Sequence, residues 1–352
     1  MALQHPGDHG PRSSVQQHVV SEDGTGQRLD RVLARLLPGV PATRIFRLIR
    51  KGEVRVNGKR ARPEQRLASG DRVRVPPVHA RSESAQSVAA GGVARVPPAL
   101  IARVTAAIVH EDERLLVLDK PAGLAVHGGS GLSYGVIEAL RAARPREPLE
   151  LAHRLDRDTS GILMVARKPA ALRVLHELLR EGAVRKSYLA LVAGRWQLGR
   201  KLIDAPLQTE ARVRGERTVR VGAGGKSART QFALVQQFGA IASLVEATLE
   251  TGRTHQIRVH AAYCGHPVAG DLKYGDPAVN AALRALGLAR MFLHAHSVSF
   301  DWPQGGQVSI SAPLPVELKR VLDALAGEAA GSGAGGGPRA ARSRRRAGSR
   351  RA

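Results

Sequence analysis

Residues 153–168 read HRLDRDTSGILMVARK, and this stretch decides the fold that we expect. Its first half places four charged residues within positions 154–158, and the sequence TSG that follows is typical of a turn. The apolar run ILMVA at 162–166 predicts a short buried strand. A charged loop that leads directly into a core strand holds its side chains on a rigid support, as a catalytic carboxylate requires. Taken alone, the pattern fits a solvated turn ahead of a strand better than it fits a catalytic loop.

The composition indicates a protein of two domains with a polyanionic partner. The chain has 352 residues, 43% of them hydrophobic, which is enough for two cores and additional tails. Its 54 Lys and Arg against 30 Asp and Glu leave a net charge of +24, which favours nucleic acid as the partner. A GC-rich genome that raises the Arg and Ala content would account for part of this excess.

Several classes of protein do not fit the sequence. A single cysteine, Cys264, provides neither a disulfide framework nor a thiolate metal cluster. No apolar run approaches the roughly 20 residues that span a bilayer, and residues 1–11 lack the apolar core of a signal peptide. We therefore expect a cytoplasmic protein without a membrane segment.

Residues 21–79 predict a small basic domain, after a disordered segment at 1–20. Apolar residues recur at helical spacing from Leu29, and a second helix is expected to open at Thr43. The dipeptide Asn57-Gly58 lies between short alternating runs and predicts a β-hairpin. The candidate RNA-binding cations lie on one face of the second helix, at Arg44, Arg47 and Lys51, and on the hairpin, at Arg55, Lys59 and Arg60. A solvated charged helix face is the alternative interpretation of these cations.

This N-terminal segment resembles the S4 (α-L) RNA-binding domain. The resemblance is carried by QRLD at 27–30, RKGEVRVNG at 50–58 and GDRV at 70–73. Such a module implies recognition of RNA by shape and phosphate contacts rather than by a sequence code.

A linker at 80–100, a second domain at 101–327 and a disordered Arg-rich tail at 328–352 complete the expected organisation. Within the second domain, short strands are expected at 115–118, 124–126, 186–192, 241–249 and 292–300, and hairpins within 197–230. Ser133 is expected to cap one helix, Pro169 to begin a second and Thr254 to cap a third. The segment at 127–131 is glycine-rich, but no Gly-Lys-Ser/Thr closes it as a phosphate loop.

The pattern of missing motifs leaves carboxylate chemistry without a cofactor. One cysteine cannot supply the Pro-Cys-x-x-Cys of a zinc deaminase, and the thirteen histidines show no metal-binding spacing. The serine-hydrolase elbow occurs only in a broken form, and the Walker and Rossmann fingerprints are absent. We therefore expect neither a metal nor a nucleotide cofactor.

Asp156 is the best candidate for that chemistry. It lies between Arg154 and Arg157, and nearby cations favour an ionised carboxylate that can act as nucleophile or general base. Asp158, two residues before Ser160, is better explained as a turn former.

Two further residues are candidates for the site. Tyr188, on a predicted strand, could stack on a flipped base or serve as a core tyrosine. Arg253, just before a predicted helix, could pair with Asp156 or with a phosphate, or be an ordinary surface arginine.

These motifs together resemble the RluA family of pseudouridine synthases. The resemblance covers about residues 21–325 and rests on HRLDRDTSG at 153–161, KSY at 186–188, TGRTHQIRVH at 251–260 and LHA at 293–295. It implies an α/β (α+β) fold with a mixed, largely antiparallel sheet and a cleft across its middle. It also implies an isomerase that flips a uridine out of RNA, breaks the N1–C1′ bond and rejoins the uracil through C5, with no cofactor.

The same resemblance assigns roles to individual residues. Asp156 would attack the sugar or abstract its 2′ proton, and Tyr188 would stack on the uracil and could take the C5 proton. Arg253 would pair with Asp156, Arg154 would help displace the base, and Leu293 would line the uracil pocket.

The stretch AVHGGSGLS at 125–133 is most similar to family members that modify large-subunit ribosomal RNA. It implies three separated uridines of 23S rRNA as the substrate of a monomeric enzyme. Two alternatives stay open: the same chemistry on tRNA or other rRNA uridines, and a non-catalytic S4-type protein of ribosome assembly.

Overall fold

The computed structural model describes residues 15–37, 40, 42–77, 96–128, 134–210 and 218–333. The chain divides into two compact units, Met1–Arg95 and Val96–Ala352, each with its own hydrophobic core. Residues 1–14 of the expected disordered start and the Arg-rich tail from residue 334 lie outside the described residues, as does most of the linker. The second unit begins earlier than expected, because Pro98 takes the first turn of a helix, α3 (Pro98–Ala106).

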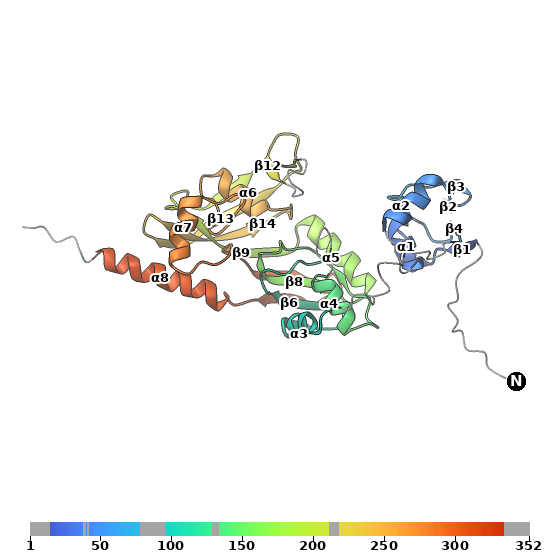
Figure 1. The fold of residues 1–352 in the computed structure, drawn as a ribbon, viewed down its shortest axis with the longest axis horizontal. Coiled ribbons are helices and arrows are strands. Elements are labelled where there is room, and N and C mark those ends of the chain that lie inside the picture. The colour runs from blue at the N-terminus through green and yellow to red at the C-terminus, as the bar shows by residue number, and fades with distance from the viewer. Residues whose placement is uncertain are drawn as a thin grey trace, which may run out of the picture. The chain divides into compact units, whose positions relative to one another are not determined.

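The N-terminal unit packs two helices on a four-stranded sheet, as Figure 1 shows. The helices are α1 (Leu29–Leu36) and α2 (Ala42–Lys51), and the strands, in the order β1-β4-β2-β3, are β1 (Gln16–Val19), β4 (Arg72–Val75), β2 (Arg55–Val56) and β3 (Lys59–Arg60). The predicted hairpin is confirmed, since Asn57 and Gly58 both take the positive φ that a tight turn requires. The prediction that residues 16–19 are disordered is wrong, because β4 offers these residues a strand edge with which they pair.

The second unit is built on a ten-stranded mixed sheet. Eight strands follow the order β10-β13-β14-β9-β15-β8-β6-β5, with β16 added to β15 and β7 added to β8. All neighbours run antiparallel except β15 and β8, so the expected mixed, largely antiparallel sheet is confirmed. The strands are β5 (Ile108–Glu111), β6 (Leu115–Lys120), β7 (Glu150–Leu151), β8 (Ser160–Ala166), β9 (Arg185–Ala193), β10 (Lys201–Asp204), β13 (Arg229–Phe238), β14 (Ala242–Leu249), β15 (Leu293–Asp301) and β16 (Gln307–Ser311).

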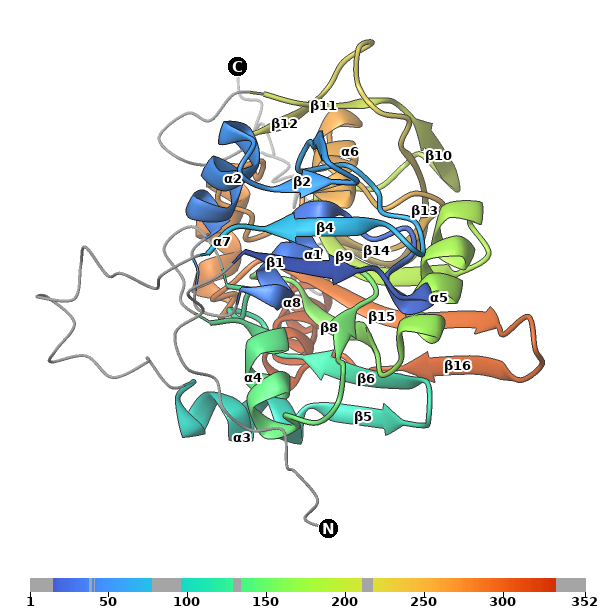
Figure 2. The same cartoon turned by 90° about the vertical axis from the view of Figure 1, so that its right-hand side faces the viewer.

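Strand β8, the apolar half of the stretch at 153–168, lies inside this sheet between β15 and β6 (Figure 2). Every one of its residues is buried, which explains the continuous apolar run. Gly161 has a φ of 107°, and a Cβ there would collide with the backbone of Ala295 on β15. Only glycine allows the two strands to approach this closely at the point where the parallel pair begins.

Helices cover both halves of the sheet. Figure 1 shows α6 and α7 with β13 and β14, and α3 and α4 with β6 and β8. Besides α3, the helices of this unit are α4 (Val136–Ala143), α5 (Pro169–Glu181), α6 (Gln256–Tyr263), α7 (Pro277–Ala285) and α8 (Val316–Gly333). A second small sheet pairs β11 (Leu207–Thr209) with β12 (Val219–Val221), which confirms a hairpin within residues 197–230.

Helix α5 begins at Pro169 as predicted, but two other helix starts differ from the prediction. Gly135 caps α4, where Glu138 accepts its backbone N–H at 2.8 Å; Ser133 lies outside the described residues. His255 precedes α6 in the left-handed conformation, with a φ of 55°, in place of the expected cap Thr254. Helix α8 extends past residue 327, where the domain was expected to end.

Residues 124–126 form no strand, although their apolar run predicted one. They lie in the loop after β6, where Leu124 and Ala125 offer their carbonyl oxygens to Lys120 and Val136 instead of to a neighbouring strand. The physical reason is that the buried ammonium of Lys120 takes up the backbone acceptors of this loop.

Candidate active site

Asp156 projects from the turn that leads into β8. The turn is closed by a hydrogen bond from the Thr159 backbone N–H to the Asp156 carbonyl oxygen at 3.2 Å. The next residue, Arg157, is held at its carbonyl oxygen by Gly123 N–H at 2.9 Å and by the Lys120 ammonium at 3.1 Å. The Asp156 side chain is 18% exposed and reaches a cavity. A carboxylate on a turn fixed at both sides matches the rigid support that the sequence predicted.

Arg258, the third residue of α6, is the partner of Asp156. Its Nη1 donates to Asp156 Oδ2 at 2.9 Å, and its Nε and Nη2 donate to the two oxygens of Asp271 at 2.7 and 2.9 Å. The Arg258 side chain is 12% exposed, and its guanidinium lies 5.0 Å from the centre of the Tyr274 ring. The planar guanidinium of Arg258 thus donates to two carboxylates and stacks on an aromatic ring, an arrangement that arginine can make and lysine cannot.

Arg253 does not pair with Asp156, so that prediction is wrong. Its Nε donates instead to the Ser227 carbonyl oxygen at 3.0 Å, and the residue is exposed at the cavity wall. The left-handed turn at His255 separates Arg253 from α6 and brings the N-terminal turn of that helix, with Arg258, to Asp156. Arg258 is part of the motif at 251–260. Periodicity could not show that the helix begins at Gln256 and directs the Arg258 side chain toward Asp156.

Asp271 holds Arg258 from behind. Its carboxylate is fully buried and also accepts the backbone N–H groups of Lys273 and Tyr274 at 2.8 and 3.1 Å. Burial raises the pKa of Asp271, but the Arg258 hydrogen bonds and charge lower it further, so the net shift is downward. The carboxylate is therefore ionised at neutral pH, and Arg258 cannot rotate away without leaving a buried charge unpaired.

His255 approaches the same carboxylate oxygen of Asp156 as Arg258 does. Its Nε2 is 3.8 Å from Asp156 Oδ2, and its Nδ1 is 2.9 Å from the Tyr274 hydroxyl, which accepts the Val219 N–H. Burial lowers the pKa of His255; Asp156 opposes that shift and Arg258 reinforces it. His255 and Asn57 are the two residues other than glycine with a positive φ in the described ranges. Strain at a residue that faces the candidate carboxylate is typical of a functional site.

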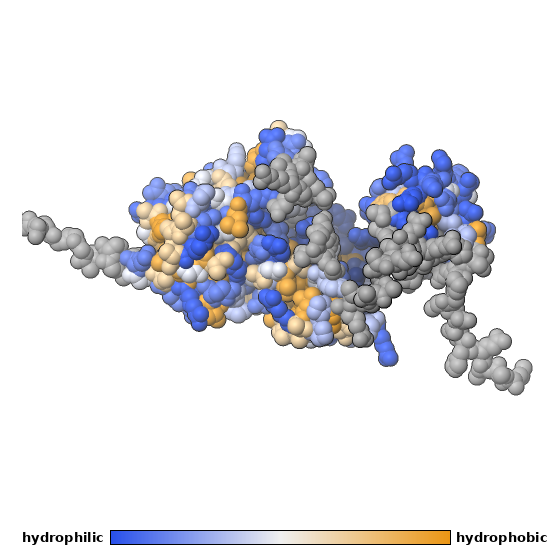
Figure 3. Space-filling view, in the orientation of Figure 1, coloured by the Kyte–Doolittle hydropathy of each residue, from blue (hydrophilic) through white to orange (hydrophobic). Residues whose placement is uncertain are grey.

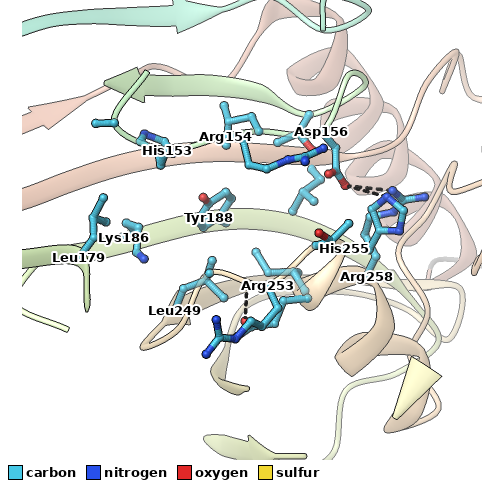
Figure 4. Close-up of a pocket in the computed structure, with 18 of the residues that line it drawn as sticks. His153, Arg154, Asp156, Leu179, Lys186, Tyr188, Leu249, Arg253, His255 and Arg258 are labelled. Carbon is cyan, nitrogen blue, oxygen red and sulfur yellow. Dashed lines mark hydrogen bonds and ion pairs between the residues drawn. The ribbon is translucent and has the colours of Figure 1, made fainter. Parts of the chain in front are cut away.

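Tyr188 and Leu293 line the same cavity as Asp156. Figure 4 shows Tyr188 across the cavity from Arg253 and beside Asp156. Tyr188 is on β9 and Leu293 begins β15, two neighbouring strands of the sheet. Burial, and secondarily the charge of Asp156, raises the pKa of the Tyr188 phenol. The phenol is therefore protonated at neutral pH, which disfavours Tyr188 as the acceptor of a proton.

Two cavities meet at Asp156. The first encloses about 410 Å³ between β9, the start of β8 and α6, and its walls are partly apolar. The second is about 860 Å³ and more polar, and is lined by the loop at 270–273 and by α7. They share five residues: Arg154, Asp156, Thr254, His255 and Arg258. Arg154 is exposed and lines both cavities.

In the ranges that the structure describes, no group of three or more His, Cys, Asp or Glu side chains is placed to hold a metal ion. Nor is any helix of those ranges long and apolar enough to cross a membrane.

The candidate RNA-binding cations of the N-terminal unit lie on its surface. Arg47 and Lys51 are exposed on α2, and Arg55, Lys59 and Arg60 are exposed on the hairpin, while Arg44 is half-buried. Figure 3 shows hydrophilic residues gathered over this part of the unit. The cations are compatible with contacts to a phosphate backbone.

A basic module joined to a domain that carries an arginine-bound aspartate beside a tyrosine-lined cavity is compatible with an enzyme that acts on nucleic acid. Comparison with known proteins makes the class specific. Residues 114–263 match the sequence profile of RNA pseudouridylate synthases, and residues 27–73 match the S4 domain.

Related proteins match almost the whole chain. Ribosomal large subunit pseudouridine synthase C of Pasteurella multocida is 51% identical over 314 residues, which are 89% of this chain and 94% of that protein. The protein of the same name from Escherichia coli K12 is 49% identical over 318 residues, 89% of this chain and 97% of that protein. Among solved structures, human RNA pseudouridylate synthase domain containing 4 superposes with a TM-score of 0.54 at 27% identity, covering 65% of this chain and 96% of that one.

The chain belongs to the family of RNA pseudouridine synthases. It is therefore an isomerase that acts on RNA, and the sequence-based expectation of this activity is confirmed.

Proposed function

We propose that the chain isomerises uridines in the RNA of the large ribosomal subunit, 23S rRNA, in the cytoplasm. This proposal rests on the sequence identity of 49–51% between the chain and two ribosomal large subunit pseudouridine synthases. The aligned region covers 94–97% of the length of those proteins. The surface cations of the S4 module support it, because a bulky folded RNA offers many phosphates to contact.

Asp156 is the group that we propose acts on the sugar. With the target uridine flipped into the first cavity, its ribose lies at Asp156, where the two cavities meet. The carboxylate either attacks C1′ or removes the 2′ proton, and both steps require its negative charge. Arg258 stabilises that charge and fixes one carboxylate oxygen, so the other oxygen is left to act on the sugar.

Tyr188 and Leu293 provide the surface for the base. A planar phenol and an apolar side chain on adjacent strands bind a uracil ring by stacking and by apolar contact. Because the phenol keeps its proton, we assign Tyr188 to positioning the ring and not to accepting the C5 proton. Arg154, at the entrance, is placed to occupy the space that the flipped nucleotide leaves in the RNA.

The reaction rearranges one nucleotide and consumes nothing. The N1–C1′ bond breaks, a C5–C1′ bond forms, C5 loses a proton and N1 gains one, so atoms and charges balance without an oxidant or a group donor. The described residues supply a carboxylate, a cation and a stacking wall for this rearrangement.

Mapping of pseudouridines in rRNA and tRNA tests the proposed substrate. A strain that lacks the gene should lose pseudouridine at discrete positions of 23S rRNA, and the wild-type gene should restore them, whereas the Asp156→Asn variant should not. Loss of tRNA pseudouridines with intact 23S rRNA would refute the proposed substrate while leaving the enzyme class in place.

A further inference from the structure

Two buried lysines of the catalytic unit differ in how their charge is satisfied. Lys120 is fully buried and donates to three carbonyl oxygens, those of Pro121, Leu124 and Arg157, at 2.9–3.1 Å. Lys186 is only 8% exposed, yet among the described residues nothing accepts a hydrogen bond from it or forms an ion pair with it. Lys120 therefore has a structural role, whereas the amino group of Lys186 is available to a ligand.

Lys186 faces the same cavity as Asp156 and Tyr188. It precedes Tyr188 by two positions on β9, so both side chains project from one face of the strand, about 7 Å apart. Figure 4 shows Tyr188 between Lys186 and Asp156. A ring that stacks on Tyr188 with its sugar at Asp156 thus directs its far edge toward Lys186.

The surroundings of Lys186 are apolar or cationic. Leu179 and Leu249 line the cavity beside it, and the Cα of Gly252 faces Nζ with no side chain between them. The titratable groups that share the cavity are His153, Arg154, His176, Arg180, Tyr188, Arg253, His255, Arg258 and, as the sole carboxylate, Asp156. Asp156 is already bound by Arg258, so no carboxylate neutralises Lys186.

Burial lowers the pKa of Lys186 to about 8, so the ammonium form predominates at neutral pH. Burial of His153, and secondarily the charge of Lys186, lowers the pKa of His153 to about 4, which keeps that imidazole neutral. An unpaired buried charge disfavours the folded state unless a ligand compensates it. A cavity with these walls selects a flat ring that has an electron-rich edge.

We propose that Lys186 donates a hydrogen bond to the carbonyl edge of the target uracil, opposite N1, and stabilises the negative charge of the detached ring. This inference rests on the proposed roles of Asp156 and Tyr188. When the N1–C1′ bond breaks, both electrons leave with the uracil, and the charge is shared by N1, O2 and O4. When the C5–C1′ bond has formed, C5 releases its proton and N1 takes one up, so the ring is neutral again and the ammonium is unchanged.

A phosphate of a flanking nucleotide is the competing ligand for Lys186. The position of Lys186 beyond Tyr188 and between two leucines favours the base, because the exposed arginines Arg154 and Arg253 at the cavity border suit a solvated phosphate better. The two ligands differ in an observable, since each lost phosphate contact reduces the salt dependence of RNA binding by about 0.7–0.9 in log–log slope.

The test compares Lys186→Met, Lys186→Arg and wild type in the full-length protein. The rate of tritium release from a 23S rRNA transcript labelled at uracil C5 is measured under single-turnover conditions from pH 6.5 to 9.5. We expect Lys186→Met to react about 10²–10³-fold more slowly, the loss typical of one preorganised donor to a developing anion. The RNA affinity and its salt slope should stay at the wild-type values.

The pH profile separates a role in chemistry from a role in folding. The wild-type rate should fall above pH 8 as the ammonium deprotonates, the Lys186→Met rate should lack that fall, and Lys186→Arg should regain part of the rate and move the fall to higher pH. Lys201→Met, at an exposed strand position on β10, is the matched control and should match wild type throughout.

Three results would overturn the inference. They are a wild-type rate in Lys186→Met, a reduced salt slope in that variant, and a rate restored by Lys186→Arg with the wild-type pH profile unmoved. Failure of the proposed function itself is distinguished by Asp156→Asn, because substantial turnover in that variant contradicts the assignment of Asp156 whatever the Lys186 variants do.

Discussion

Replacing Arg258 with methionine removes the cation that joins Asp156 to the fully buried Asp271. The fold then holds an unpaired buried carboxylate, which costs about 3–5 kcal/mol of the free energy of unfolding. Asp271→Asn added to Arg258→Met removes that charge, while the amide oxygen still accepts the backbone N–H groups of Lys273 and Tyr274. We therefore expect the double variant to recover most of the lost stability.

Activity should not recover with stability. Both variants lack the charge-assisted hydrogen bond to Asp156, which contributes about 1.5–3 kcal/mol. If that energy orients the carboxylate for reaction, the rate falls about 10- to 150-fold. Arg258→Lys should lose rate as well, because one ammonium cannot reproduce three donors shared between two carboxylates.

Denaturant unfolding and single-turnover tritium release, measured on the same preparations, check both parts. Stability of the wild type should also decline below about pH 4. The reason is that the pKa of Asp271 is lowered on folding, so its contribution is complete above the unfolded value of 3.8 and is lost as pH falls through the folded value. A stable double variant with the wild-type rate would refute the positioning role of Arg258, and a double variant as unstable as Arg258→Met would refute the buried-pair argument.

Three further predictions follow from the same geometry. Lys120→Met removes the donor of the Pro121 and Leu124 carbonyl oxygens and one of the two donors of the Arg157 carbonyl oxygen, so we expect about 2–4 kcal/mol of destabilisation in denaturant unfolding. Lys186→Met should instead match or exceed wild-type stability. Tyr188→Phe should keep more than about a tenth of the single-turnover rate while Tyr188→Ala loses about two to three kcal/mol of stacking; a large loss in Tyr188→Phe would instead implicate the hydroxyl. Arg47→Ala with Lys51→Ala should reduce the salt slope of RNA binding by about 1.4–1.8 and leave the rate at saturating RNA unchanged; an unchanged slope would argue against RNA contact by α2.

Local patterns predicted the parts of the fold whose causes are local. The continuous apolar run at 162–166 became the buried strand β8, Pro169 began α5, and Asn57-Gly58 closed the hairpin. Asp156 was selected because its charged loop precedes a core strand. Strand periodicity alone left Tyr188 as a core tyrosine, and its place in the site came from the resemblance to the family.

The misassigned partner of Asp156 depended on tertiary structure. Arg258 is 102 positions from Asp156 in sequence. The two residues meet because His255 takes the left-handed conformation and α6 begins only at Gln256. Asp271, which fixes Arg258, lies in a loop without periodicity. Strand β1 was missed for a related reason, since its four residues are a strand only where β4 offers them an edge.

The sequence also could not predict that Lys186 has no hydrogen-bond partner among the described residues. Alternation placed it on the face of β9 that carries Tyr188, but pattern alone cannot distinguish a lysine bound by three carbonyl oxygens from one that is bound by none. That distinction is made by the loops that surround each side chain.

The most direct test of the account is the turnover of Asp156→Asn on 23S rRNA, measured together with its RNA affinity. The substitution keeps the size of the side chain and an oxygen acceptor for Arg258, so the cavity and the RNA-binding surfaces stay intact. We predict that pseudouridine formation is abolished while the dissociation constant for 23S rRNA stays nearly unchanged. Turnover above a few per cent of wild type would contradict the assignment of Asp156 as the group that acts on the sugar.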